Sequence, residues 1–163
     1  MKAKVFLLSF VCLIFTFCAT APLEKKWATG KEKYWNPQPL ENAVAQSTQA
    51  FKDLAFDQLW ETCEKTLIRL NFIFYTSNKQ EGTVYVRSTS PEAKIDFGDS
   101  SKGETIQDDP NRSVTLYIKL SQADGTLTLT CHVFVPMTKS DWQILAKKEL
   151  NRFLDALKKE LKR

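Results

Sequence analysis

Apolar residues in this chain follow a helical period near residue 60 and again at the C-terminus. Between residues 56 and 70 they recur every three or four positions: Phe56, Leu59, Trp60, Cys63, Leu67 and Leu70. This spacing predicts an amphipathic helix that begins between Ser47 and Asp53. It should end at Asn71, because Asn tolerates the left-handed conformation common at helix C-termini. A second helix is predicted from Ser140, which with Gln143 forms a capping box, to about Leu161.

Between these helices the pattern changes to the alternation typical of strands. Residues 72–77 and 83–88 are β-branched and aromatic and flank a turn segment, so they predict a hairpin. A second hairpin is predicted over residues 114–120 and 127–135, with one buried and one wet face. The predicted order is α-β-β-β-β-α. We therefore expect an α+β two-layer sandwich, in which a four-stranded antiparallel sheet carries both helices on one face.

Two cysteines fall on the buried sides of these elements. Cys63 lies on the apolar stripe of the first helix and Cys131 on the buried face of the fourth strand, so both should face the same layer. In an oxidising compartment they are a disulfide candidate. Two unlinked buried thiols are the other interpretation, because a bridge needs Cα atoms within about 7 Å of each other.

The N-terminus has the pattern of an export signal. Lys2 and Lys4 precede an apolar run over residues 5–17, which is too short to cross a bilayer of roughly 30 Å, and small residues follow it. We predict a signal peptide over residues 1–17 and a protein that works outside the cytoplasm.

Two cleavage sites compete at the end of this signal. Cleavage before Cys18 would make that residue a lipidation site and anchor the protein in a membrane through several acyl chains. The run Cys-Ala-Thr-Ala-Pro resembles the start of many bacterial lipoproteins, although Phe17 stands where Gly or Ala is usual. Cleavage after Ala21 would release a soluble protein, with Pro22 unfavourably placed after the cut bond. We predict lipidation of Cys18, and its alternative is that Cys18 is an ordinary apolar residue of the leader, like Cys12.

Residues 18–46 are predicted to be a flexible linker, and residues 47–163 a single α+β domain. The segment from 24 to 39 mixes charge, Gly and Pro without a helical or strand period. It also contains three aromatic residues, Trp27, Tyr34 and Trp35. These side chains either contact a partner or the lipid headgroups, or fold back against the domain, and we favour the second interpretation.

The segment between the two hairpins is long and carries charge of both signs. Connections of more than about 12–15 residues are uncommon in compact domains and are often binding loops. Its charged residues include Lys94, Asp99, Lys102, Glu104, Asp108 and Asp109. The acidic residues lack the spacing and the glycine of a calcium loop, so we expect no metal there. A solvated loop is the simplest interpretation, and its length leads us to hypothesise that it contacts a partner.

Nothing in the sequence predicts an enzyme, a cofactor or a metal site. His132 is the only histidine, on the expected wet face of a strand, with no cysteine or acidic residue at ligand spacing. The formal charge of +4 falls to about +2 when Lys2 and Lys4 leave with the signal peptide. That charge is too small to indicate a nucleic-acid partner.

The element pattern resembles a known group of proteins. The run from Leu59 to Phe72, the segment Gly82-Thr-Val-Tyr-Val and the amphipathic C-terminal helix resemble small bacterial envelope lipoproteins, distantly including the domains of the C component of the outer-membrane β-barrel assembly machinery. The resemblance implies a non-enzymatic accessory or scaffolding domain that is tethered to the outer membrane, faces the periplasm and contacts other envelope proteins. A soluble secreted or periplasmic protein that binds a small apolar ligand is the alternative, and a hydrolase is a third interpretation.

Overall fold

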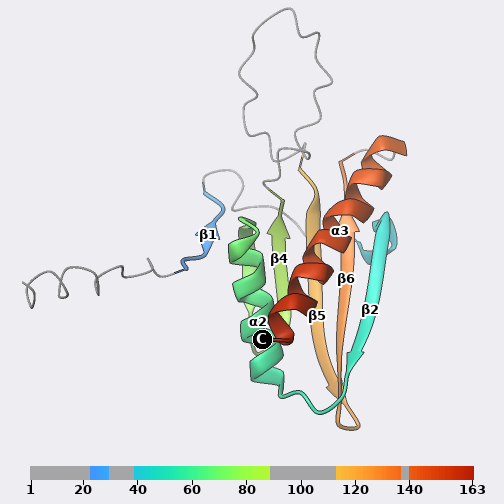
Figure 1. The fold of residues 1–163 in the computed structure, drawn as a ribbon. Coiled ribbons are helices and arrows are strands. Elements are labelled where there is room, and N and C mark those ends of the chain that lie inside the picture. The colour runs from blue at the N-terminus through green and yellow to red at the C-terminus, as the bar shows by residue number, and fades with distance from the viewer. Residues whose placement is uncertain (1–22, 30–38, 89–112, 137–139) are drawn as a thin grey trace, which may run out of the picture.

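The computed structural model describes residues 23–29, 39–88, 113–136 and 140–163. These residues form an α+β fold, a six-stranded mixed sheet with two helices packed against one face (Figure 1). The strands are β1 (Lys26–Trp27), β2 (Ala45–Phe51), β3 (Ile73–Asn78), β4 (Thr83–Arg87), β5 (Thr115–Ala123) and β6 (Thr126–Phe134). The helices are α2 (Phe56–Arg69) and α3 (Ser140–Leu161), and a short 3-10 turn, η3, covers Leu40–Asn42.

The sheet has the strand order β1-β3-β4-β5-β6-β2. Its four central strands are the two predicted hairpins, which pair antiparallel with one another. Asp124 and Gly125 join β5 to β6 and have φ angles of 50° and 73°. Two positive φ values in a two-residue loop are typical of a type I′ turn, whose twist matches that of the flanking strands.

The prediction of a four-stranded antiparallel sheet is wrong at both edges. Residues 45–51 form β2, which pairs antiparallel with β6, and α2 begins only at Phe56. The prediction that this helix begins between Ser47 and Asp53 is therefore wrong. The β2 sequence Ala-Gln-Ser-Thr-Gln-Ala-Phe has no alternation of apolar residues, and pairing with β6, far along the chain, decides its conformation.

At the other edge, β1 pairs in parallel with β3, which makes the sheet mixed. Only Lys26 and Trp27 form this strand, too few residues for a sequence period to be visible. Both β1 and the first residues of β2 fall within the segment predicted to be a linker. Because β1 and β2 lie at opposite edges of the sheet, this N-terminal segment contributes a strand to each edge.

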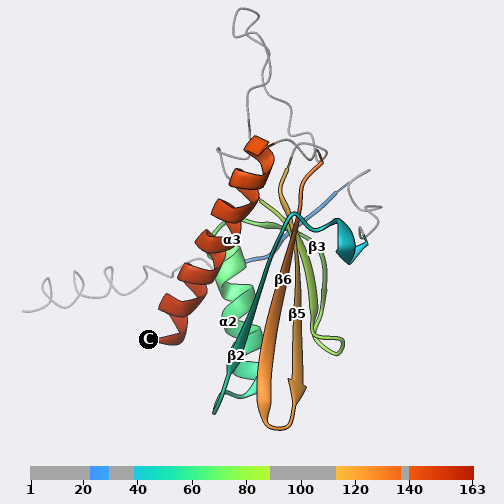
Figure 2. The ribbon, with the colours of Figure 1, turned by 90° about the vertical axis from the view of Figure 1, so that its right-hand side faces the viewer.

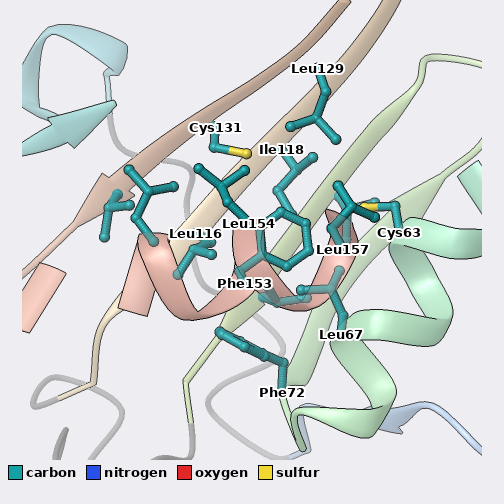
Figure 3. Packing of buried hydrophobic residues seen from close by; sticks show 14 of the residues in the cluster. Cys63, Leu67, Phe72, Leu116, Ile118, Leu129, Cys131, Phe153, Leu154 and Leu157 are labelled. Carbon is teal, nitrogen blue, oxygen red and sulfur yellow. The ribbon is translucent and has the colours of Figure 1, made fainter. Parts of the chain in front are cut away.

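The main hydrophobic core fills the layer between the sheet and the helices. Figure 2 shows both helices on one side of the sheet, and Figure 3 shows the side chains that meet there. The alternating residues predicted to be buried in the second hairpin, such as Leu116, Ile118 and Leu129, are indeed fully buried. Glu160 near the end of α3 forms ion pairs with Arg69 of α2 and with Arg163, which ties the two helices together outside the core.

The end of α2 confirms the predicted role of Asn71. Its φ angle is 61°, in the left-handed region. The backbone N–H of Phe72 donates to the carbonyl of Leu67 at 3.0 Å, and that of Asn71 to Ile68 at 2.9 Å. These two bonds form the Schellman motif, which satisfies the last carbonyls of a helix.

The face of the sheet that is turned away from the helices is less exposed to solvent than the alternation predicts. Phe134 is 1 % exposed and Tyr85 is 9 % exposed, although neither belongs to the core beneath the helices. Strand pairing places Tyr85 opposite Tyr117 and Tyr117 opposite His132. Because of this cross-strand contact, His132 is half-buried in an aromatic row instead of exposed.

Candidate functional site

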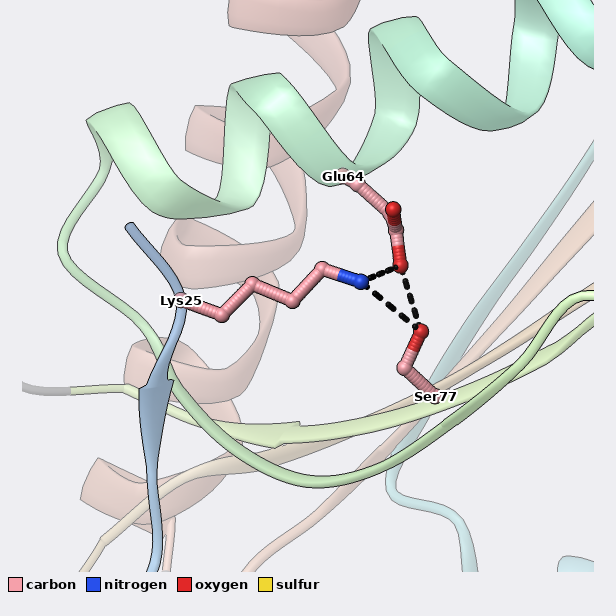
Figure 4. A network of polar contacts seen from close by, with 3 residues as sticks. All are labelled: Lys25, Glu64 and Ser77. Carbon is pink, nitrogen blue, oxygen red and sulfur yellow. Dashed lines mark hydrogen bonds and ion pairs between the residues drawn. The ribbon is translucent and has the colours of Figure 1, made fainter. Parts of the chain in front are cut away.

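The N-terminal segment is held on the domain by a cluster of polar contacts (Figure 4). The ammonium group of Lys25, just before β1, forms an ion pair with Glu64 of α2 and lies 3.4 Å from the hydroxyl of Ser77 on β3. The Ser77 hydroxyl donates to the same Glu64 carboxylate oxygen. Lys25 therefore links three elements, and we call Lys25, Glu64 and Ser77 the N-terminal clamp.

Aromatic and backbone contacts support this clamp. The rings of Trp27 and Phe74 lie 5.8 Å apart between centroids, and the Lys25 ammonium is 5.8 Å and 5.6 Å from these two rings. The N–H of Ala28 donates to the carbonyl of Phe74 at 2.8 Å, and Lys26 donates to the side chain of Asn71. Trp27 thus contacts the domain itself, as we favoured from the sequence, while half of its surface stays exposed. Tyr34 and Trp35 lie outside the described residues.

A second polar cluster joins Ser88 and Val114, the described residues that flank the predicted partner loop, to α3. Ser88 follows β4, and its N–H donates to the carbonyl of Val114, just before β5, at 2.8 Å. The Ser88 hydroxyl donates to the Glu149 carboxylate of α3 at 2.6 Å. The two ends of the loop are therefore bonded to each other and to α3.

Glu149 is the most deeply buried charged residue in this cluster, with no exposed surface. Arg152 donates to the same carboxylate oxygen from Nη2 at 2.7 Å and from Nε at 3.2 Å, and its guanidinium lies 5.2 Å from the ring of Phe72. The other oxygen, Oε1, has no hydrogen-bond partner among the described residues. Burying a carboxylate is costly, and removing one of its partners leaves a buried charge without compensation. The contacts of Glu149 with Ser88 and Arg152 are therefore needed to hold Ser88 against α3.

The two core cysteines are buried free thiols in the structure. As predicted, Cys63 and Cys131 face the layer between helices and sheet, within the same hydrophobic cluster (Figure 3). Burial raises the pKa of Cys131 from 9.0 to about 12. Burial, with smaller contributions from Cys131 and Glu64, also raises the pKa of Cys63 well above its ordinary value. Neither thiol is therefore a nucleophile at neutral pH.

Burial also affects the tyrosines on the opposite face of the sheet. The rings of Tyr85 and Tyr117 lie 4.5 Å apart, and those of Tyr117 and His132 lie 6.0 Å apart. Burial, and then the proximity of Tyr117, raise the pKa of Tyr85 to about 12. Burial, and then Glu81, raise the pKa of Tyr117. Both hydroxyls therefore stay protonated at physiological pH and act as neutral hydrogen-bonding groups.

Several predicted site residues lie outside the part of the chain that the structure describes. They are the lipidation site Cys18 and the charged residues of the proposed partner loop, Lys94, Asp99, Lys102, Glu104, Asp108 and Asp109. Their roles stay predictions. What the structure adds is the position of their neighbours: Lys25 is docked on the sheet, and Ser88 and Val114 fix the base of the loop.

The described residues give no sign of a metal centre or a helical membrane span. Within the described ranges, no group of three or more His, Cys, Asp and Glu residues comes together as a metal site. No helix there has the length and apolar character needed to cross a bilayer.

The clamp and the loop base were both missed from sequence, for different reasons. Glu149 falls on the apolar stripe of α3, between Ala146 and Leu150, so a buried carboxylate could have been inferred from its position. No such signal exists for the clamp. Lys25 is one of several lysines in a segment without periodicity, and its partners come from elements far along the chain.

Comparison with known proteins gives no relative from which a function could be transferred. No protein-family model matches this chain, and no curated protein is significantly similar to it.

Proposed function

We propose that this chain is a non-enzymatic domain of the bacterial cell envelope, tethered to a membrane through a lipid on Cys18 and used for protein interaction. The export signal and the lipoprotein-like run at Cys18 support the tether. The proposed location is the outer membrane, with the domain facing the periplasm.

The observation that carries this proposal is the docking of the N-terminal segment. Lys25 is only seven residues after Cys18, and the clamp fixes it to α2 and β3. Seven extended residues span at most about 25 Å. If the segment were free as far as β2, the tether would span up to about 90 Å when extended. Docking therefore keeps the domain close to the membrane in which Cys18 is anchored.

The predicted loop of residues 91–112 provides the proposed contact with other envelope proteins. Its ends are fixed by the Ser88–Val114 backbone bond and by the buried Glu149 carboxylate. A loop on a rigid base loses less conformational freedom on binding than one on a mobile base, which favours affinity. We infer that the charged residues of this loop contact a partner of complementary charge; they are Lys94, Asp99, Lys102, Glu104, Asp108 and Asp109.

The alternative is a soluble protein that binds a small apolar ligand. The layer between the helices and the sheet is occupied by the protein's own side chains, including Trp142, Phe153 and Leu116, which are at most 1 % exposed. An apolar ligand would therefore need a site elsewhere, and we prefer the tethered domain.

Metabolic labelling with a fatty acid tests the tether directly. The wild-type protein should carry the label and sediment with membranes, whereas Cys18→Ala should lose both properties. Cys12→Ala is the matched control, because Cys12 lies within the predicted signal peptide and its replacement should leave labelling unchanged. An unlabelled wild-type protein, or a labelled Cys18→Ala variant, would contradict the proposal.

A further inference from the structure

Cationic side chains gather where the N-terminal segment, α2 and the end of α3 meet. Lys26 of β1 donates to the side chain of Asn71, which follows α2. Arg69, the last residue of α2, forms an ion pair with Glu160 of α3, and Arg163 bonds to the same carboxylate oxygen. These contacts bring three elements together, so their cations lie near one another. We call this surface the basic patch, and its members are Lys26, Arg69, Lys158, Lys159, Lys162 and Arg163.

The basic patch is exposed, and its lysines keep their charge available. Lys158, Lys159 and Lys162 are exposed, and none of them forms an ion pair with a described residue. On this part of α3 the carboxylates are Glu160, which two arginines already engage, and Asp155. Cations therefore outnumber carboxylates at the end of α3, which gives this surface a positive potential.

Exposed apolar side chains lie in the same N-terminal segment as Lys26. Four large apolar side chains are exposed among the described residues, and two of them, Leu23 and Trp27, belong to this short segment. Each of the two is 50 % exposed. Trp side chains are enriched at the headgroup level of membranes, and basic residues attract anionic lipids. An exposed Trp beside a basic surface therefore fits a phospholipid headgroup layer.

The proposed tether reaches the domain on the same side as the basic patch. Lys25 lies just before β1, and its ammonium group contacts Glu64 of α2, so the chain ahead of β1 lies on the helix side of the sheet. Figure 2 shows the C-terminal end of α3 on that side as well. Because Cys18 is only seven residues before Lys25, a lipid on Cys18 would hold the basic patch near the membrane surface.

We propose that the basic patch binds the headgroups of anionic phospholipids in the membrane that anchors Cys18. The inference rests on the proposed tether and adds an orientation, in which the C-terminal ends of α2 and α3 are turned toward the bilayer. Each lysine or arginine near an anionic membrane surface contributes to the attraction, and salt screens it within a Debye length. Binding through this patch should therefore depend on anionic lipid and on low ionic strength.

Amine labelling of the protein on vesicles tests this inference. Protein purified from membranes is reconstituted into phosphatidylcholine vesicles with or without the anionic lipid phosphatidylglycerol, and mass spectrometry follows the acylation of each lysine. With phosphatidylglycerol, Lys158, Lys159 and Lys162 should label at least about threefold more slowly. High salt should remove this difference. Lys52, which follows β2 at the far edge of the sheet, is the internal control and should label equally on both kinds of vesicle.

Flotation of the same vesicles separates this inference from the tether. If the protein floats with the neutral vesicles but its lysines label equally on both kinds, the basic patch does not bind lipid and the tether stands. If the protein floats with neither kind, the tether fails, and this inference fails with it. Protection of the lysines that survives high salt would also overturn the inference, because such a contact is not electrostatic.

Removal of two charges tests the residues of the patch. The double variant Lys158→Gln, Lys162→Gln lowers the positive charge without placing carboxylates at a helix C-terminus, where the dipole disfavours them. The protection of Lys159 by phosphatidylglycerol should then be largely lost. The matched control, Lys52→Gln with Lys119→Gln, removes two charges away from the patch and should keep it. Circular dichroism checks that both variants fold. Full protection of Lys159 in the first variant, or its loss in the control, would overturn the assignment of the patch.

Discussion

At the scale of single residues, burial decides the chemistry of this protein more than residue type does. Glu149 has no exposed surface and is held by Ser88 and Arg152. Cys63 and Cys131 are buried among apolar side chains, and desolvation favours their neutral forms. Residue types that are reactive in water therefore serve as structural groups here.

The cysteines give a direct residue-scale prediction. In the full chain with Cys12→Ala and Cys18→Ala, which leaves only Cys63 and Cys131, native protein at neutral pH should react very slowly with a thiol reagent such as dithionitrobenzoate, because burial raises the pKa of both thiols. In denaturant, the two thiols should react at once. Rapid reaction of the native protein would contradict the buried environment, and no reaction after denaturation would show that Cys63 and Cys131 form the disulfide.

At the scale of elements, the sequence predicted those helices and strands whose own residues carry the signal. Both helices have apolar residues at spacings of three and four, and β5 and β6 have them at a spacing of two. β3 and β4 are instead rich in β-branched and aromatic residues. All of these signals come from the element itself. Asn71 likewise marked the end of α2. β1 and β2 could not be predicted this way. One is two residues long and the other has no apolar alternation, so their distant partners β3 and β6 determine their conformation.

The turn between β3 and β4 depends on a glycine that the sequence alone does not distinguish from others. Gly82 has a φ angle of 65°, and a Cβ atom there would lie 2.3 Å from the backbone oxygen of Leu120. Gly125 has a similar φ angle of 73° but open space around it. Gly125→Ala should therefore lower the free energy of unfolding by only about 1–2 kcal/mol, which is the cost of the left-handed conformation for a residue with a side chain.

Gly82→Ala should lower the free energy of unfolding by about 1–3 kcal/mol more than Gly125→Ala does, because the clash with the Leu120 backbone forces β4 and β5 apart. Urea denaturation of the two variants measures the difference. Equal losses would show that the backbone relaxes around Gly82 without cost.

The N-terminal clamp gives a second prediction at this scale. Lys25 and Lys26 are trypsin sites that docking on β3 should protect. Glu64→Gln removes the charge that holds Lys25, so cleavage after these lysines should become severalfold faster in the native variant. Glu61→Gln, an exposed change on the same helix, is the matched control and should leave the cleavage rate unchanged. If both variants are cleaved at the wild-type rate, the ion pair does not hold the segment.

At the scale of the whole molecule, the docked N-terminal segment and the residues that flank the predicted partner loop lie at different places on the sheet. The N-terminal segment docks at the β1 edge, whereas Ser88 and Val114 lie at one end of the central strands, where Ser88 contacts α3. The proposed tether and the proposed partner contact would therefore not compete for the same surface. The fold class was predicted from sequence, but this layout was not, because it depends on which strands form the edges.

The loop can be tested without disturbing the rest of the domain. Deleting residues 98–108 removes Asp99, Lys102, Glu104 and Asp108 but leaves Ser88 and Val114, which close the base of the loop. We expect a midpoint of unfolding close to that of the wild type and reduced co-purification of envelope proteins. Co-purification at the wild-type level would contradict the partner role of this loop.

The intact mass of the protein purified from membranes tests the central claim most directly. We predict a chain that begins at Cys18, with residues 1–17 removed and the mass of a diacylglycerol and an acyl chain added. A chain that begins at Pro22, or one that retains Met1 and the leader, would contradict the tethered domain.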